Sequence, residues 1–400
     1  AGLLQKLFSQ KLRFRRDDGT DFSGWTEIRL GDYLVPHRER VPADTEVPIF
    51  SSSREGLKPQ KEYFADREVE NFGEYGIVPK GYITYRHMSD DLTFKFNLNT
   101  FGHPIAVSKE YPVFATSDMD PRFLVYWLNH SREFGEFAVM QKKGGTRTRL
   151  HFNVLSELRF EAPHPDEQRK IADALAAVDE KIAALSRKIG VLEKFRGGVM
   201  HNLFFGKKRF RAPSGLSYPK WATIRLGDAF KNRVEPDTSD MPVYSVTQDR
   251  GMVPRNTLDR EFGGSAEITG YRRAKTGDLV YNTMRMWQGA VGIAPEDCCV
   301  SPAYVVLAPK NGAVAEFFVR RLRESTMVQH LKAWSHGLTE DRLRLYYPDF
   351  ASIRLQVPHP DEQRKIADAL SALDAKIAAL AGQITHMETF KKGLLQQMFV

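Results

Sequence analysis

The stretch PHPDEQRKIADAL occupies residues 163–175 and returns without a single change at residues 358–370. Identity over thirteen residues, about 195 positions apart, indicates a duplicated domain, because solenoid and propeller repeats have much shorter periods. The match continues without a gap, since LEKFRGGVMHNLF at residues 192–204 aligns with METFKKGLLQQMF at residues 387–399. The repeat therefore includes the proline-rich stretch and the whole segment that follows it.

Both repeated segments have the pattern of a long helix. Pro165 and Pro360 suit the first helical position, and the Asp-Glu pair after each proline places negative charge at the positive end of the helix dipole. Apolar residues then recur in alternating steps of four and three, which is the heptad spacing of a coiled coil. The predicted seam consists of Ile171, Leu175, Val178, Ile182, Leu185, Ile189 and Leu192, and of Ile366, Leu370, Leu373, Ile377, Leu380, Ile384 and Met387.

The two predicted helices should pair with each other. GLLQKLF at residues 2–8 resembles the helix ends at residues 198–204 and 393–399, so the chain begins with the motif that closes it. The second helix must then return toward the first domain, which predicts an antiparallel pair. About 40 residues at 1.5 Å each make a rod of roughly 60 Å, with one globular domain at each end. The seam alone also permits each helix to pack only on its own domain.

The segments between the helices are related but more divergent. WTEIRLGDYL at residues 25–34 aligns with WATIRLGDAF at 221–230, and GYITYRHM at 81–88 aligns with GDLVYNTM at 277–284. Short apolar and aromatic stretches separated by Gly and Pro predict strands and turns, with helices only at residues 121–129 and 314–334. Tyr85 and Tyr281, which match in the repeat, are expected in the cores.

These patterns predict an α+β fold with a pseudo-twofold internal duplication. Two mixed, mostly β domains are joined by two long antiparallel coiled-coil helices. The predicted boundaries are a first domain with a helical N-terminal tail at residues 1–162, a first helix at 163–206, a second domain at 207–357 and a second helix at 358–400.

Polar and basic clusters recur at matching places in the two domains. Such side chains are candidates for contacts with nucleic-acid bases or phosphates, although each one taken singly could also be a solvated loop residue. The candidates are Ser52, Ser53, Arg54, Lys58, Lys142, Lys143, Thr146, Arg147 and Arg149 in the first domain, and Thr247, Gln248, Arg250, Arg255, Arg285, Trp287, Gln288, His336, Thr339 and Arg342 in the second.

Composition agrees with a polyanionic partner without requiring one. The net charge is +8 and the pI is about 9.2, but neither domain is a basic block, so contacts must come from local clusters. The two cysteines, Cys298 and Cys299, are adjacent and are expected to be buried small apolar residues rather than metal ligands. With no signal peptide or long apolar run, we expect a cytoplasmic protein.

Motifs that would make the chain an enzyme by itself are missing. We find no G-x-x-x-x-G-K-[ST] phosphate loop, no Asn/Asp-Pro-Pro-aromatic motif and no paired metal ligands at zinc spacing. His164 and His359 precede the helix prolines, and Asp32 and Asp228 lie in the repeated RLGD. Helix-start and turn roles are therefore favoured for these four residues over catalysis.

The repeated P-x-x-E-Q-x-x-I starts at residues 163–171 and 358–366, with the W-x-x-I-R-L-G-D openings, resemble the specificity subunit (HsdS) of type I restriction-modification enzymes. The resemblance covers essentially the whole chain; Tyr82 departs from the G-D-L-V-Y pattern seen at Gly277. It implies two target-recognition domains that each bind half of a split DNA target, helices that fix the gap, and no catalytic site. By the same resemblance, two modification subunits would dock on the outer faces of the helix pair and the helical ends of the chain and methylate adenine with S-adenosylmethionine. Two restriction subunits, where present, would use ATP and Mg²⁺. A duplicated coiled-coil scaffold that joins protein partners without reading DNA is the rival hypothesis.

Overall fold

The structure is a computed structural model that describes residues 13–64, 73–142, 147–236, 241–258, 270–339 and 342–398. Two compact units divide the chain, one formed by Ala1–Lys188 with Leu380–Val400 and the other by Ile189–Ala379. Each unit takes the first half of one long helix and the second half of the other, whereas the sequence predicted a separate segment for each helix. The predicted α+β class is confirmed. Residues 2–8, which resemble the helix ends, lie outside the described residues.

Both units contain the same four-stranded antiparallel sheet. The strand order is β2-β11-β7-β9 in the first unit and β15-β22-β19-β20 in the second. The strands are β2 (Leu34–His37), β7 (Ile83–Tyr85), β9 (Phe96–Leu98), β11 (Val113–Thr116), β15 (Phe230–Arg233), β19 (Leu279–Asn282), β20 (Val291–Ile293) and β22 (Tyr304–Pro309).

Each unit also closes with a two-stranded sheet directly before a long helix, β1-β13 in the first and β14-β23 in the second. The further sheets differ, because β4 and β5 pair only with each other in the first unit, whereas their counterparts β16 and β17 join β21 and β18 in one sheet. These strands are β1 (Thr26–Arg29), β3 (Arg40–Pro42), β4 (Phe50–Ser53), β5 (Gly56–Pro59), β6 (Glu74–Val78), β8 (Met88–Ser89), β10 (Ile105–Ser108), β12 (Thr148–Arg149), β13 (Arg159–Ala162), β14 (Ala222–Arg225), β16 (Val243–Thr247), β17 (Gly251–Pro254), β18 (Arg272–Ala274), β21 (Cys298–Val300) and β23 (Arg354–Val357).

Short helices cover the sheets. The helix predicted at residues 121–129 is confirmed as α3, capped by Asp120, which accepts hydrogen bonds from two backbone amides of the first turn. The helix predicted at residues 314–334 is two helices, because Glu324 leaves the helical conformation and caps the second one. The helices are η1 (Leu30–Tyr33), α2 (Gln60–Phe64), α3 (Pro121–His130), α4 (Arg132–Met140), α5 (Phe152–Leu155), α6 (Pro165–Phe204), α7 (Leu226–Ala229), η2 (Arg255–Thr257), η3 (Met286–Gln288), α8 (Ala315–Leu322), α9 (Ser325–Ala333), α10 (Tyr347–Ser352) and α11 (Pro360–Met398).

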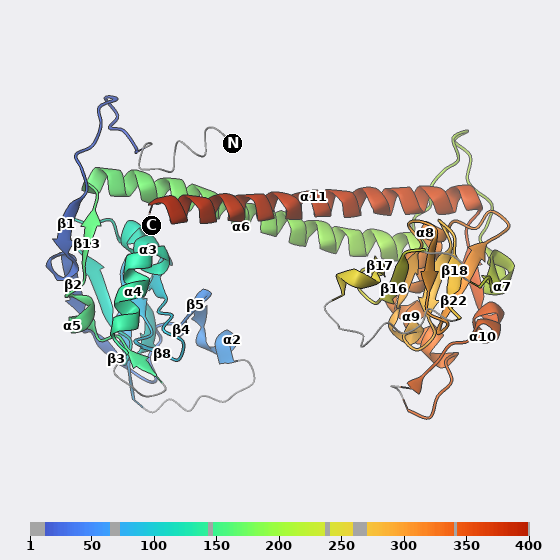
Figure 1. Ribbon diagram of the computed structural model, residues 1–400, viewed down its shortest axis with the longest axis horizontal. Helices are drawn as coiled ribbons and strands as arrows, with labels where there is room; N and C mark the ends of the chain where they lie inside the picture. The colour runs from blue at the N-terminus through green and yellow to red at the C-terminus, as the bar shows by residue number, and fades with distance from the viewer. Residues whose placement is uncertain are drawn as a thin grey trace. The chain divides into compact units, whose positions relative to one another are not determined.

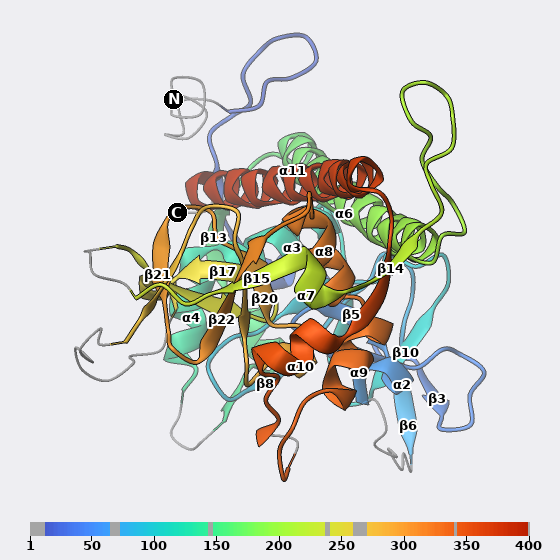
Figure 2. The ribbon, with the colours of Figure 1, turned by 90° about the vertical axis from the view of Figure 1, so that its right-hand side faces the viewer.

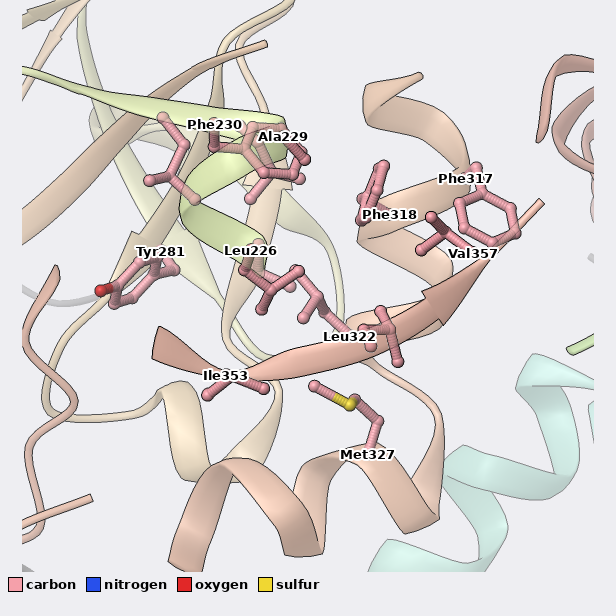
Figure 3. Packing of buried hydrophobic residues seen from close by; sticks show 14 of the residues in the cluster. Leu226, Ala229, Phe230, Tyr281, Phe317, Phe318, Leu322, Met327, Ile353 and Val357 are labelled. Atoms are coloured by element: carbon pink, nitrogen blue, oxygen red, sulfur yellow. The ribbon is translucent and has the colours of Figure 1, made fainter. Parts of the chain in front are cut away.

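Each unit has its own apolar core. In the second unit, Phe318 of α8 faces Phe230, which directly follows α7, whereas Phe317 lies beside Val357 (Figure 3), and α7 lies beside α10 (Figure 2). Tyr85 and Tyr281 are fully buried, as predicted from their matched positions. Cys298 and Cys299 are buried too, as expected for small apolar residues.

The long helices run antiparallel within each unit. In the first unit, where the end of α11 lies beside the first half of α6 (Figure 1), Lys391 of α11 lies 2.6 Å from Asp179 of α6, and Leu395 belongs to the same buried cluster as Ile171 and Leu175. The second unit repeats this arrangement with the helices exchanged, since Arg196 of α6 lies 2.8 Å from Asp374 of α11. All fourteen predicted seam residues are buried or half-buried.

The repeated stretch fixes each helix to the arm of chain that precedes its unit. Glu167 is buried and receives the guanidinium of Arg13 at 2.5 Å; Glu362 is fully buried and receives that of Arg209 at 2.6 Å. Both arginines make two contacts with the carboxylate, the bidentate geometry that gives strong charge-assisted hydrogen bonds. We call this glutamate-arginine pair, present once in each unit, the clamp.

A glutamine beside each clamp fixes the helix to its globular domain. Gln363 donates to the carbonyl of Pro358 at 2.9 Å and accepts from the backbone amide of Val314 at the start of α8. Gln168 makes the equivalent bonds to Pro163 and Asp120. The Glu-Gln dipeptide is therefore identical in the two copies because each carboxylate and amide has a fixed buried partner.

One buried pair differs between the copies at matched positions. In the second unit Arg233 on β15 lies 2.6 Å from the carboxylate of Asp278, whose side chain is only 4% exposed. The matching residues of the first unit are His37 on β2 and Tyr82, whose rings meet edge to face with centroids 5.2 Å apart. This explains the departure at Tyr82 from the G-D-L-V-Y pattern, since its partner has changed with it.

Replacing Asp278 by asparagine should destabilise the second unit by about 2 kcal/mol, because Arg233 is then left half-satisfied in a largely buried site. The measurement is the free energy of local opening from hydrogen exchange of β19 and β22 peptides. Asp249→Asn, which removes an exposed pair with Arg250, should change it by no more than about 0.5 kcal/mol. Equal effects of the two variants would contradict this reading.

Candidate nucleic-acid interface

A polar hollow in the first unit lies beside the β4-β5 hairpin, α2 and β8, which are labelled in Figure 1. Its volume is about 470 Å³, and four residues predicted from sequence, Ser52, Ser53, Arg54 and Lys58, line it. The complete lining is Ser52, Ser53, Arg54, Glu55, Lys58, Glu62, Tyr63, Arg86, Met88, Ser89, Asp90, Thr93 and Lys95.

The two serines are held by the hairpin. The hydroxyl of Ser53 donates to the carbonyl of Gly56 at 2.8 Å and shapes the turn. Ser52 is buried, and its oxygen accepts a hydrogen bond from Asn97 at 2.8 Å. Since that bond uses the oxygen only as an acceptor, the hydroxyl hydrogen of Ser52 remains able to donate.

The exposed arginines at the rim are paired with adjacent aspartates. Arg54 lies 2.6 Å from Asp91, and Arg147 lies 2.9 Å from Asp90. The Ser89 hydroxyl, the Thr93 amide and then Arg54 bond to Asp91 and lower the pKa of its carboxyl to about 2. Lys58 is paired with Glu55. A ligand that takes these cations must therefore replace a carboxylate partner.

The chain segment before the first long helix joins this surface. Arg149 pairs with Met88 across β12 and β8, and the amide of Leu150 donates to the carbonyl of His87. Lys142 is exposed at the end of α4, whereas Lys143 and Thr146 lie outside the described residues. Residues 52–58 of the hairpin and residues 147–149 are far apart in sequence. The structure brings them to the two sides of β8 and the turn that follows it.

The second unit brings its late clusters together in the same way. The amide of Leu345 donates to the carbonyl of Thr283, matching the bond between Leu150 and His87. Trp287 donates its indole N–H to the carbonyl of Met284, and Lys332 of α9 lies over its ring at 5.5 Å. Arg285 is exposed and Gln288 half-buried on η3, while His336, Thr339 and Arg342 are exposed in the loop after α9.

The predicted residues of the second hairpin divide into turn-forming and exposed side chains. Thr247 donates to the carbonyl of Gly251 and accepts from the amide of Arg250, so it forms the turn. Gln248 and Arg250 are exposed. Arg255 is half-buried and lies 2.5 Å from the hydroxyl of Tyr271.

Several residues at the first surface were not predicted from sequence. Arg86, Asp90, Asp91 and Lys95 lie on or beside the cavity, although none belonged to a recognised cluster. Arg86 directly follows the matched Tyr85, so its position next to a repeated core strand was the available signal. Lys95 is isolated among apolar residues in sequence and could not be identified without the fold.

Four polar residues outside these surfaces have structural roles. His164 and His359 stack against Phe22 and Tyr218 in the two arms, and Asp228 accepts a hydrogen bond from the amide of Arg225. Asp32 pairs with Arg29. Within the described residues, no cluster of three or more potential metal ligands occurs, and no helix is long and apolar enough to cross a membrane.

His87, at the contact between the two sides of the surface, makes the first unit sensitive to acid. Burial and then the neighbouring His151 lower the pKa of His87 below its ordinary value. An unfolded histidine titrates near pH 6.5, so the unfolded chain binds the proton first and stability falls as the pH drops below that value. His87→Phe should flatten the pH dependence of β7 and β8 opening between pH 7 and 5, measured by hydrogen exchange; an unchanged slope would contradict the assignment.

Comparison with known proteins gives these surfaces a context. A family model described as the type I restriction modification DNA specificity domain matches residues 24–194 and again residues 219–389. The chain belongs to this family. The specificity domain is duplicated, as the repeat predicted, and the resemblance to type I specificity subunits is confirmed. The chain is thus a specificity subunit of a type I restriction-modification system with two DNA specificity domains.

Named relatives of this specificity subunit have the same description. The putative type I restriction enzyme MjaX specificity subunit of Methanocaldococcus jannaschii is 24% identical over 69% of this chain and 67% of its own length. The MjaVIII specificity subunit of the same organism is 22% identical over 93% of this chain and 91% of its own length. The fold is similar to the crystal structure of the type I S subunit from M. genitalium, with a TM-score of 0.58 and 16% identity over 95% of this chain and 97% of that one.

Proposed function

We propose that each unit of this specificity subunit reads one half of a split DNA target and that the antiparallel helices fix the spacing of the halves. The main support is a contrast between the two units. Both hold their helices with the same clamp, whereas the polar residues around β8 in the first unit differ from those around η3 in the second. Phosphate contacts then supply affinity that depends strongly on salt, and exposed loop side chains read base edges. In this proposal the chain recognises the DNA and leaves catalysis to partner subunits.

Partner subunits complete the activity. A modification subunit would transfer the methyl group of S-adenosylmethionine to adenine in the target, and restriction subunits would consume ATP with Mg²⁺. Neither cofactor is assigned to this chain, whose role is to place the partners on the DNA. Two modification subunits are expected, because the resemblance to type I specificity subunits implies two.

An apolar strip on the second half of α6 is our candidate docking surface for one modification subunit. Val191 and Phe195 are 67% and 57% exposed, and a groove of about 440 Å³ beside Phe195 continues to Phe210. Exposed aromatic and aliphatic side chains next to a groove are typical of a protein interface. Phe195→Asp should leave the fold intact and weaken copurification of the modification subunit by at least tenfold; Glu193→Lys on a neighbouring position is the charge-changing control.

The deciding experiment is long-read modification sequencing of genomic DNA from the source cell and from a strain that lacks this gene. A split methyladenine motif that disappears on deletion would establish the function and give both half-sites with their spacer. An unchanged pattern in the presence of an active modification partner would refute it and favour a scaffold. Exchanging residues 25–162 for the corresponding domain of a relative should then change only one half-site.

A further inference from the structure

Two cations at the cavity of the first unit differ from their neighbours, because neither forms a direct ion pair with a carboxylate of the described residues. Arg86 and Lys95 line the cavity, and neither forms an ion pair or hydrogen bond with any residue in the described part of the chain. By contrast, Arg54 and Lys58, which line the same cavity, are matched with Asp91 and Glu55. The unpaired positive charge of the cavity therefore resides on Arg86 and Lys95, and Glu62 is the one lining carboxylate that forms no salt bridge with a described residue.

Lys95 is held in an unfavourable place for a lone cation. Its side chain is half-buried directly before β9, where burial and the nearby Lys391 lower the pKa of the ammonium group and outweigh the opposing effect of Asp179. Removing a charge from water without a partner is costly, so an anion that entered the cavity would recover part of that energy. Arg86 is exposed and offers several N–H donors in a plane.

A neutral donor adjoins these cations. Ser52 lines the same cavity and is only 6% exposed, and its oxygen is fixed by Asn97, which leaves its hydroxyl hydrogen available. Two cations and a hydroxyl around a hollow are suited to the tetrahedral, multiply charged oxygens of a phosphate group. The carboxylates that also line the hollow are Glu55, Glu62 and Asp90; Glu55 and Asp90 already pair with Lys58 and Arg147.

We propose that Arg86, Lys95 and Ser52 form a phosphate seat that holds one backbone phosphate of the DNA beside the first half-site. This inference rests on the proposed function and adds to it the residues that supply affinity rather than base recognition. The paired Arg54 then contributes less to affinity than its exposure suggests, because a phosphate must first displace Asp91. Free phosphorylated compounds share the chemistry, and the test separates them from DNA.

The test measures the affinity of the full chain, assembled with its modification subunits, for a duplex with the target and for an unrelated duplex at several salt concentrations. Lys95→Gln and Arg86→Gln should each lower affinity about fivefold to tenfold for both duplexes and flatten the plot of log affinity against log salt by about one. Arg54→Gln should alter that slope by less than half as much. Lys95→Arg, which keeps the charge, should restore the slope.

Controls keep the outcomes distinct. Lys80→Gln, at an exposed turn outside the cavity, should leave the slope unchanged. Parent-like slopes for both cavity variants would overturn the seat, and so would a loss confined to the target duplex, which would mean base reading. Binding of inorganic phosphate or adenosine monophosphate that the variants lose while their DNA slopes stay the same would assign the cavity to a small ligand instead. If the parent complex shows no preference for the target duplex, the proposed function fails. The change in salt dependence caused by the cavity variants would still test the phosphate seat.

Discussion

Glu362→Ala should destabilise the second unit by about 3 kcal/mol, among the largest effects expected of a single substitution in this chain. The carboxylate is fully buried and bidentate with Arg209, whose side chain is 29% exposed. Removing one partner of such a pair leaves the other charge partly desolvated and frees the arm that carries it. Hydrogen exchange of peptides from the arm at residues 209–218 and from the start of α11 should accelerate together.

Asp361→Ala provides the matched control for this clamp variant. Asp361 is the neighbouring acid in the same first helical turn, but its side chain is 60% exposed. Its removal should cost no more than about 0.5 kcal/mol, mostly from the helix dipole. Glu167→Ala should reproduce the clamp effect in the first unit. If Glu362→Ala and Asp361→Ala are equally mild, the clamp is not what holds the helix to its unit.

Four residues inserted after Lys188 and four after Gln383 should lengthen the accepted spacer of the DNA target by one or two base pairs. The two sites match in the repeat, so both helices grow by about 6 Å, close to the rise of two base pairs. Four residues also turn a helix about 40° beyond a full turn, and two base pairs turn DNA about 70° in the same sense. Both half-sites should remain unchanged in modification sequencing.

The insertion in α6 alone is the control for the spacer experiment. It displaces the seam residues after Lys188 relative to α11, so pairs such as Arg196 with Asp374 can no longer form together with Lys391 and Asp179. Modification should then fall at every spacer length. A double insertion that keeps the parental spacer would show that the helices do not measure the DNA.

Much of the fold could be predicted because the repeat provides an internal comparison. The two identical stretches predicted the helix starts, and the match of residues 2–8 to the helix ends predicted the antiparallel pairing. The break between α8 and α9 was missed, because Glu324 is an ordinary helix former in sequence and becomes a cap only through the path of the chain. The clamp was missed for a related reason, since Arg209 and Glu362 are far apart along the chain.

Fewer residues of the candidate interface could be predicted from the sequence. Arg54 and Arg147 stood out as loop cations, yet their counter-ions Asp91 and Asp90 could be identified only from the fold. Lys95 was not predicted as a site residue, because in sequence it is a single charge among apolar residues. Only the fold of the sheet brings it to the cavity. Clusters in sequence indicate exposed charge, whereas unneutralised charge depends on contacts between distant segments.

The pair His37 with Tyr82 in one unit and Arg233 with Asp278 in the other limits how the two copies could be recombined. A chimaera joined anywhere between these two positions would set histidine against aspartate or arginine against tyrosine. The second combination leaves the guanidinium of Arg233, whose side chain is largely covered, without its buried partner Asp278. The smallest interchangeable block therefore runs from the start of β1 to the end of β13, or from β14 to β23, with crossover points at the identical sequences beside the long helices.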